Sequence, residues 1–200
     1  MIGAYNLAKT HFEQLHIRKS NLKEFSNTVI HCALKHNLQS SKTRRLKGKR
    51  KRVGQTISMG NAVDDYLTRG ETTNVEAKLI GDAMKVALAK NGLKIRTTQQ
   101  EWVHEPAKYS ATCDLVCETT HGDVVIVECK TGYDDDSSMD IARVQACLQS
   151  LAYAAVYSAD PPQSYVLRCR EPGRKAELSV VGETYQQISL GIVNDRMKKL

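Results

Sequence analysis

The first feature of this sequence that could do chemistry is a strand-like run that ends in charged residues. Residues 124–132 read VVIVECKTG, in which four apolar residues precede Glu128, Cys129 and Lys130. Side chains alternate between the faces of a strand, so Glu128 and Lys130 share one face while Cys129 points to the other. Burying both charges is costly unless they have partners. The run therefore predicts a polar pocket on one face of the strand.

A second carboxylate is expected in the same pocket. Asp114 lies in the preceding strand-like run TCDLVCE, and the turn at residues 120–122 would place that strand beside Glu128. Two facing carboxylates repel each other unless a cation lies between them, and Mg²⁺ or Mn²⁺ prefers oxygen ligands. Such a metal lowers the pKa of a bound water, which Lys130 can orient or deprotonate. This chemistry is the hydrolysis of a phosphodiester through a Mg-bound water.

This arrangement resembles a known nuclease family. Asp114, thirteen intervening residues and then Glu128-Cys129-Lys130 is similar to the motif of the PD-(D/E)XK nuclease superfamily, and Gln149 with Tyr153 on the next helix is similar to the QxxxY signature of its RecB-like branch. That branch includes the lambda exonuclease and mitochondrial genome maintenance exonuclease types. The likeness covers about residues 57–157. It implies a restriction-endonuclease-like core and a metal-dependent, exonuclease-like deoxyribonuclease of DNA repair or recombination.

The resemblance also implies a further metal ligand from a helix before the sheet. In the family this is a His after a GxxxH pattern or an acidic residue, and here Gly60 is followed four residues later by Asp64. Asp64 is the preferred ligand, and Asp65 and Glu76 are its alternatives. The metal ligands would then be Asp64 or Glu76 with Asp114, Glu128 and the backbone carbonyl of Cys129. The catalytic residues would be Asp114, Glu128 and Lys130.

Nucleic-acid contacts are predicted from two segments. Gln149 and Tyr153 share a helix face that Gln145 and Tyr157 extend, and by resemblance this stripe contacts DNA phosphate or supports the metal ligands. Alternatively, it is a helix edge at the core boundary. The second segment, residues 42–52, reads KTRRLKGKRKR and carries eight of the 29 cations, which leaves 21 against 22 carboxylates elsewhere. Its Arg50, Lys51 and Arg52 would clamp DNA without sequence preference. The same run also fits a nuclear-import signal or a solvated linker.

The spacing of apolar residues predicts an α/β fold with a mixed central sheet flanked by helices. One or two helices are expected before residue 40 and a linker up to about residue 55. Helices at 59–68 and 74–91 would follow, then a three-stranded antiparallel meander from Leu93, a helix at 138–157, two strands and a final helix from Glu183. We expect a helical extension with a basic arm over residues 1–55 and a nuclease core over residues 56–200.

Composition limits the setting of the protein. No apolar run is long enough to span a membrane and the first residues lack a secretory signal, while the six Cys form no CxxC pair, so an intracellular, reducing compartment is expected. Zinc binding by Cys113 and Cys117 is a minor alternative. Trp102 is expected in the core, and His104 and His121 at the surface or in turns. Glu101 and Glu105 are further candidates for the pocket.

Two other functions fit the same residues. One is a catalytically inactive nuclease-fold protein that binds nucleic acid or a protein partner, and Asp64 in place of His keeps this alternative open. The other is an RNA-directed endonuclease, against which the Gln149 and Tyr153 helix argues. For the leading function, single-stranded DNA or duplex ends are the expected partner. Fold analogy does not determine the oligomeric state.

Overall fold

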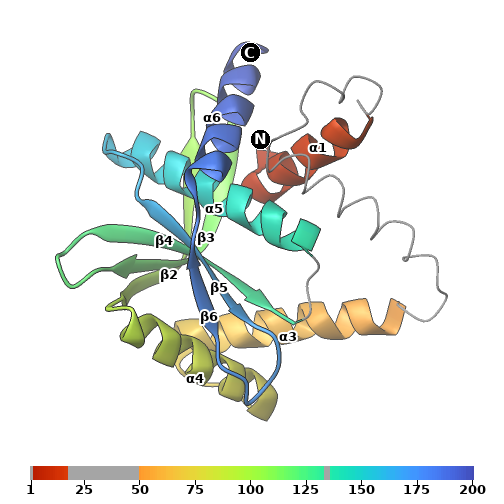
Figure 1. The fold of residues 1–200 in the computed structure, drawn as a ribbon, viewed down its shortest axis with the longest axis vertical. Coiled ribbons are helices and arrows are strands. Elements are labelled where there is room, and N and C mark those ends of the chain that lie inside the picture. Colours follow the sequence, from red (N-terminus) through yellow and green to blue (C-terminus); the bar gives the residue numbers. More distant parts are fainter. Residues whose placement is uncertain (1, 18–49, 133–135) are drawn as a thin grey trace.

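The computed structural model describes residues 2–17, 50–132 and 136–200. Within these residues six strands form one open mixed sheet, and five helices flank it (Figure 1). This confirms the α/β class and the mixed sheet. In chain order the elements are β1 (Ile2–Gly3), α1 (Ala4–Ile17), α3 (Arg50–Arg69), α4 (Val75–Lys90), β2 (Lys94–His104), β3 (Tyr109–Glu118), β4 (Val124–Thr131), α5 (Asp136–Tyr157), β5 (Gln163–Cys169), β6 (Glu177–Val180) and α6 (Glu183–Met197).

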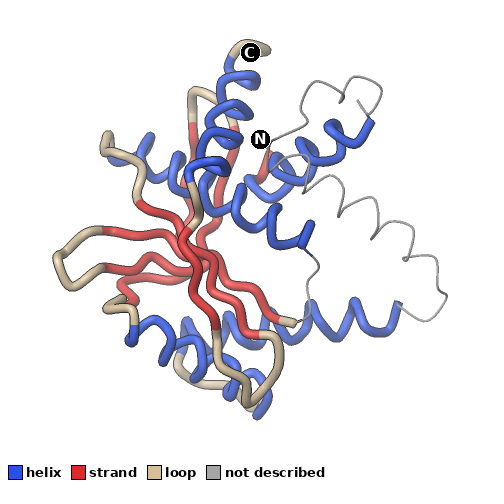
Figure 2. Tube along the Cα trace, viewed as in Figure 1, coloured by secondary structure: helices blue, strands red, loops and turns tan. Residues whose placement is uncertain are grey.

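The sheet is a central layer between two layers of helices. Its order is β2-β3-β4-β5-β6, with β4 and β5 parallel and the other neighbours in this series antiparallel. The short β1 pairs in parallel with the start of β3. Helices α1, α5 and α6 cover one face of the sheet, and α3 and α4 cover the other (Figure 2). The crossover through α5 explains how β4 and β5 run parallel, since parallel neighbours need a long connection.

Most of the predicted elements are present. The meander is confirmed as β2, β3 and β4, and α4 is bounded by the predicted Asn residues. The Asn74 side chain caps the helix by accepting a 3.1 Å hydrogen bond from the backbone N–H of Ala77. Asn91 ends it with Gly92, which has a φ of 67°. A polar cap at each end thus fixes the length of this helix.

The start of α3 corrects the sequence prediction. The predicted linker extends to about residue 55, but the helix begins at Arg50, inside the basic run. Arg, Lys and Gln are good helix formers, and the segment contains no Pro that would stop a helix. Arg50, Lys51 and Arg52 therefore lie in the first turn of α3. The rest of the basic run, residues 42–49, lies outside the described residues.

The beginning of the chain packs on the same sheet as the predicted nuclease core. Leu7 and Phe12 of α1 are buried in one hydrophobic cluster with Leu148 of α5 and Ile192 of α6. Residues 2–3 also add the strand β1 to the sheet, which apolar spacing does not predict because two residues carry no periodicity. Residues 18–49, the remainder of the predicted extension, lie outside the described part of the chain.

Two large hydrophobic clusters fill the spaces on the two sides of the sheet, and a smaller third one joins α5 to β5. The larger joins α1, α5 and α6 to the sheet and contains Trp102, as predicted, whereas the second joins α3 and α4 to it. The five described cysteines are buried, and none of them forms a disulfide. In the described residues, no helix combines the length and apolar character that crossing a bilayer demands.

Candidate active site

The candidate site lies where β3 and β4 separate. Their ladder runs from the pair Glu118 and Val124 to the pair Leu115 and Val127, and no pairing continues beyond it in the described residues. Buried backbone groups at such an opening still need partners. The Asp114 carboxylate accepts a 2.7 Å hydrogen bond from the backbone N–H of Cys129. The opening therefore places Asp114 beside the residues that follow Val127.

The alternation of β3 changes at Asp114. Ala111 and Cys113, which precede it, lie in the cluster on the α5 side of the sheet. In a regular strand Leu115 would face that side too, but it lies in the opposite cluster, and Val116 faces the α5 side instead. On the neighbouring strand β2, Gln99 lies between the residues that pair with Cys113 and Leu115, and its φ is 50°. Positive φ is rare for a residue with a side chain. The two strands are thus both irregular at the level of Asp114.

Glu128 is the most buried charged side chain of the site. It is 1% exposed and on the α5 side of the sheet, whereas Cys129 lies in the opposite cluster, as strand alternation predicts. Its Oε1 accepts a 2.6 Å hydrogen bond from Lys130 Nζ, and its Oε2 accepts one of 2.7 Å from Gln149 Nε2. Both carboxylate oxygens of Glu128 are therefore held, one by a charge and one by an amide.

Gln149 joins the helix α5 to the opening in the sheet. Its side chain is fully buried, and the same Nε2 also donates a 2.8 Å hydrogen bond to the backbone carbonyl of Thr112. Because both partners are acceptors, the amide nitrogen must face them, which leaves Oε1 on the other side. That Oε1 is buried and has no hydrogen-bond partner within the described residues. It is a ready acceptor for a donor that enters the site.

Asp64 brings a third carboxylate from α3. It is half-buried, and burial together with the negative charge of Glu128 raises its pKa from 3.8 to about 6, although Lys130 acts in the opposite direction. Burial and the charges of Glu128 and Asp64 also raise the pKa of Asp114 well above its usual value. Each shift means that the negative form is disfavoured. Asp64, Asp114 and Glu128 thus form a cluster that lacks enough positive charge.

Gly60 marks the place where α3 faces the end of β4. A Cβ atom at this position would lie 3.5 Å from Thr131 Oγ1, an ordinary van der Waals distance. One helical turn later, Asp64 stands on the same side of α3 as Gly60, since residues four apart are neighbours on a helix surface. This spacing explains how a helix on the α4 side of the sheet delivers a carboxylate to Glu128 and Lys130.

The donor chemistry of this cluster suits a hard divalent cation. Three carboxylates and the unpartnered amide oxygen of Gln149 are oxygen ligands or acceptors for coordinated water, which Mg²⁺ and Mn²⁺ prefer. As they stand, however, no three His, Cys, Asp or Glu side chains of the described residues are close enough together to hold a metal ion. The Lys130 ammonium, 2.6 Å from Glu128, supplies the nearest positive charge. To bind a metal through Glu128 Oε1, the ion pair between Lys130 and Glu128 has to separate.

Other predicted site residues lie elsewhere. Asp65 is exposed and pairs with Arg69 at 3.8 Å, and Glu76 is exposed in the first turn of α4. Of the three candidate helical carboxylates, only Asp64 contributes to the shifted pKa of Asp114. Glu101 on the outer strand β2 and Glu105 in the turn after it are exposed as well, so neither joins the pocket.

The remaining residues of the α5 stripe differ from Gln149. Gln145 is half-buried, and its Oε1 has no hydrogen-bond partner in the described part of the chain. Tyr153 packs edge-on against Trp102, with ring centroids 5.3 Å apart. The ring centroid of Tyr157 lies 4.5 Å from that of Tyr153. The stripe therefore runs from a buried amide at the carboxylates to an exposed tyrosine at the surface.

The thiols near the site are unsuited to zinc. Cys113 and Cys117 lie on opposite faces of the sheet, in the two different hydrophobic clusters. Burial raises the pKa of both thiols in the metal-free protein. Thiols on opposite faces of the sheet do not converge on one ion, which disfavours the minor zinc alternative.

Sequence reasoning missed Arg168 on β5. It stands in register with Lys130 on the neighbouring parallel strand, so the two cations share one face of the sheet. The alternation in SYVLRCRE already places Arg168 and Arg170 on one face of a strand, but the pairing of β5 with β4 is a tertiary contact.

No known family model and no curated protein sequence matches this chain.

Proposed function

We propose that this chain is a metal-dependent deoxyribonuclease of the PD-(D/E)XK type, with a restriction-endonuclease-like core, that hydrolyses DNA phosphodiester bonds. The observation that supports the proposal most is the electrostatic interaction of Asp64, Asp114 and Glu128, which come from three separate elements and lie near Lys130. Burial and the neighbouring negative charges raise the pKa of Asp64 and of Asp114, and such repulsion is unfavourable in a purely structural site. A cation-binding function explains why they are together.

Asp64, Asp114 and Glu128 are the residues that would hold the metal. When bound, a divalent cation at this place lowers the pKa of coordinated water and offsets negative charge on the phosphate. Gln149 fixes the orientation of Glu128 through its 2.7 Å hydrogen bond and presents its free Oε1 to a water donor. The Cys129 N–H holds Asp114 in a similar way. Two of the three carboxylates are therefore oriented by the fold itself.

Lys130 is proposed to act directly on the reacting groups. In the structure its ammonium neutralises Glu128, and with a metal held by the carboxylates it would lie close to the attacking water or a phosphate oxygen. Hydrolysis forms the bond between water oxygen and phosphorus and breaks the bond to the departing sugar oxygen, which leaves with a proton. Arg50, Lys51 and Arg52 at the start of α3 are proposed to attract the DNA backbone.

A second candidate function is a nuclease fold without catalysis that binds nucleic acid or a protein. The observation in its favour is the closed pair between Lys130 and Glu128, which occupies one of the carboxylate oxygens that a metal would need. In such a protein, Lys130 would permanently replace the metal charge. This alternative predicts no Mg²⁺-dependent turnover at all.

The two candidates are separated by a cleavage assay on the full chain. Linear and closed circular DNA are incubated with Mg²⁺, Mn²⁺ or EDTA, and the parent is compared with Asp114→Asn and Lys130→Ala. We expect metal-dependent cleavage by the parent and a loss of at least about a hundredfold in both variants, since each removes a group at the reacting centre. Asp195→Asn, an exposed carboxylate on α6, is the matched control. Cleavage that survives both site substitutions contradicts the proposal.

A further inference from the structure

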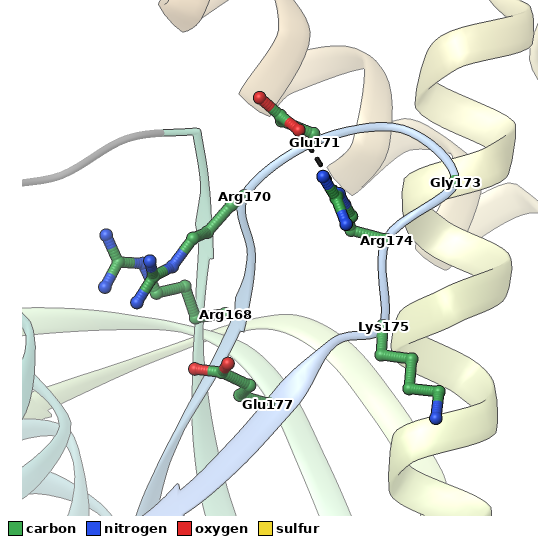
Figure 3. A pocket seen from close by; sticks show the side chains of 7 residues that line it. All are labelled: Arg168, Arg170, Glu171, Gly173, Arg174, Lys175 and Glu177. Carbon is green, nitrogen blue, oxygen red and sulfur yellow. Dashed lines mark ion pairs between the residues drawn. The ribbon is translucent and has the colours of Figure 1, made fainter.

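A second charged feature lies at the hairpin between β5 and β6. A pocket of about 560 Å³, here called the hairpin pocket, is lined by Arg168, Arg170, Glu171, Gly173, Arg174, Lys175 and Glu177 (Figure 3). Figure 3 shows Arg168 and Arg170 extending to the same side of the hairpin, with Arg174 and Lys175 on its other limb. Four of the seven lining residues are cations and two are carboxylates.

The cations of the hairpin pocket exceed what its carboxylates neutralise. Arg174 pairs with Glu171 at 3.5 Å, and this contact is weak because the arginine side chain is 75% exposed. Among the residues that the structure describes, Arg170 and Lys175 form no ion pair. Like charges around one hollow repel unless an anion lies among them. This excess of positive charge suits a negatively charged ligand.

The hairpin pocket adjoins the candidate active site through paired strands. Arg168 is in register with Lys130 on the parallel strand β4, and strands in a sheet lie about 4.8 Å apart. Beyond this pair the Gly132 N–H donates a 3.1 Å hydrogen bond to the Cys169 carbonyl, which keeps the two strand ends together. A row of cations therefore leads from Lys130 through Arg168 to Arg170.

We propose that the hairpin pocket binds the phosphate backbone of the nucleic-acid strand next to the bond that is cut. The inference rests on the proposed nuclease function and names a binding site for its substrate. Each strand of a duplex carries one phosphate per about 3.4 Å of helix axis, so a strand centred at Lys130 brings a neighbouring phosphate within reach of the next strand of the sheet. Guanidinium groups match phosphate oxygens in pairs, which favours arginine at such a place.

The turn of the hairpin leaves space for that backbone. Gly173 has a φ of 77°, and a Cβ atom there would meet nothing within 4 Å. Arg170 and Arg174 are both exposed, so their removal deletes charge without opening the core. These two positions therefore permit a test of binding that is separate from folding.

The test measures affinity of the full chain for a labelled single-stranded oligonucleotide in EDTA, over a range of salt concentrations. Removing two phosphate contacts in Arg170→Gln/Arg174→Gln should weaken binding at low salt about tenfold or more. The slope of the logarithm of the binding constant against the logarithm of the salt concentration should become less steep by about 1.4, since each contact contributes about 0.7. Arg170→Lys/Arg174→Lys should recover most of the slope because the charges remain. The matched control is Lys198→Gln/Lys199→Gln, which removes two exposed charges near the carboxyl end, far from the hairpin (Figure 1).

Equal effects of the hairpin and control variants would overturn the proposal. So would equally effective competition by a polyglutamate peptide of the same charge, which would indicate an acidic protein ligand. Cleavage with Mg²⁺, measured in parallel, separates the two levels of inference. A parent that binds through the hairpin but never cleaves contradicts the nuclease proposal alone. A parent that cleaves, with KM and affinity unchanged in Arg170→Gln/Arg174→Gln, contradicts the hairpin pocket alone.

Discussion

The Gln149 side chain holds Glu128 from the helix layer above the sheet, with 2.7 Å between Nε2 and Oε2. The same nitrogen also donates to the Thr112 carbonyl at the opening between β3 and β4. One amide therefore donates both to a buried carboxylate and to a backbone carbonyl of β3. Through this residue the stability of the fold and the geometry of the site depend on each other.

Replacing Gln149 should cost stability as well as activity. In Gln149→Leu the buried Glu128 oxygen and the Thr112 carbonyl both lose their donor, and the buried carboxylate is the costlier loss, so the free energy of unfolding should fall by about 2–4 kcal/mol. Urea denaturation measures this change. Gln187→Leu, at an exposed position of α6, should stay within about 0.5 kcal/mol of the parent. A Gln149 variant as stable as this control would show that the amide carries no structural role.

Asp114→Asn should stabilise the metal-free protein while it abolishes cleavage. Burial and the charges of Glu128 and Asp64 raise the pKa of Asp114, so the folded state disfavours its negative form at neutral pH. The neutral amide removes this repulsion, and its oxygen can still accept the Cys129 N–H. We expect a gain on the order of 1 kcal/mol, the scale of a one-unit pKa shift.

Thermal unfolding in EDTA at about pH 7.5 is the measurement, with Asp195→Asn as the control for a surface carboxylate. Mg²⁺ should raise the melting temperature of the parent more than that of Asp114→Asn. A metal-free Asp114→Asn protein that is less stable than the parent would argue that this carboxylate is held favourably, and the metal explanation would lose its support.

His104 should make the fold sensitive to acid. The sequence predicts it at the surface or in a turn, but it is 8% exposed, its Nδ1 accepts a 3.2 Å hydrogen bond from the Ala107 N–H, and its ring stacks on Tyr109. Burial lowers its pKa below 6.5, although a backbone hydrogen bond acts in the opposite direction. The unfolded chain therefore binds this proton more tightly, and stability should fall as pH drops below about 6.5 and level off below the folded pKa.

Comparing His104→Asn with the parent isolates this contribution. The Asn oxygen can accept the Ala107 N–H but does not titrate, so its unfolding free energy between about pH 7.5 and 5 should decline less. Because the pKa values of Asp64 and Asp114 are raised in the folded protein, these two residues make the fold more stable as the pH falls. That effect is the same in the parent and in His104→Asn. His121→Asn, at the exposed β3–β4 turn, should keep the slope of the parent. Parallel slopes in all three proteins would contradict the assignment.

Gly81 fixes the distance between α3 and α4. A Cβ atom there would clash with Cδ1 of Tyr66, a buried ring whose hydroxyl donates a hydrogen bond to Asp82. Gly81→Ala must displace that ring and with it the turn of α3 that carries Asp64. We expect a loss of about 1–3 kcal/mol in urea denaturation and weaker metal binding.

The matched control is another helical glycine. A Cβ atom at Gly191 on α6 would meet nothing within 4 Å, so Gly191→Ala should raise stability by up to about 1 kcal/mol through helix propensity. If both substitutions stabilise, the contact with Tyr66 does not limit the approach of the two helices.

The sequence alone determined most of the elements and the residue types of the candidate site. Apolar spacing predicts the helices and the meander because local periodicity reports the face that each element buries. The carboxylate and ammonium at the end of β4 indicate a polar pocket, since such charges are too costly to bury without partners. The predicted start of α3 is wrong, because the cations that suggest a linker are also good helix formers.

Only the tertiary structure decided which of the candidates meet. Asp64 approaches Glu128 while Asp65 and Glu76 remain exposed, and that choice depends on how α3 rotates against the sheet rather than on residue type. The opening of the ladder at Asp114 and the register of Arg168 with Lys130 join residues from strands distant in sequence. Contacts of this kind come from packing and strand pairing, which local patterns do not encode.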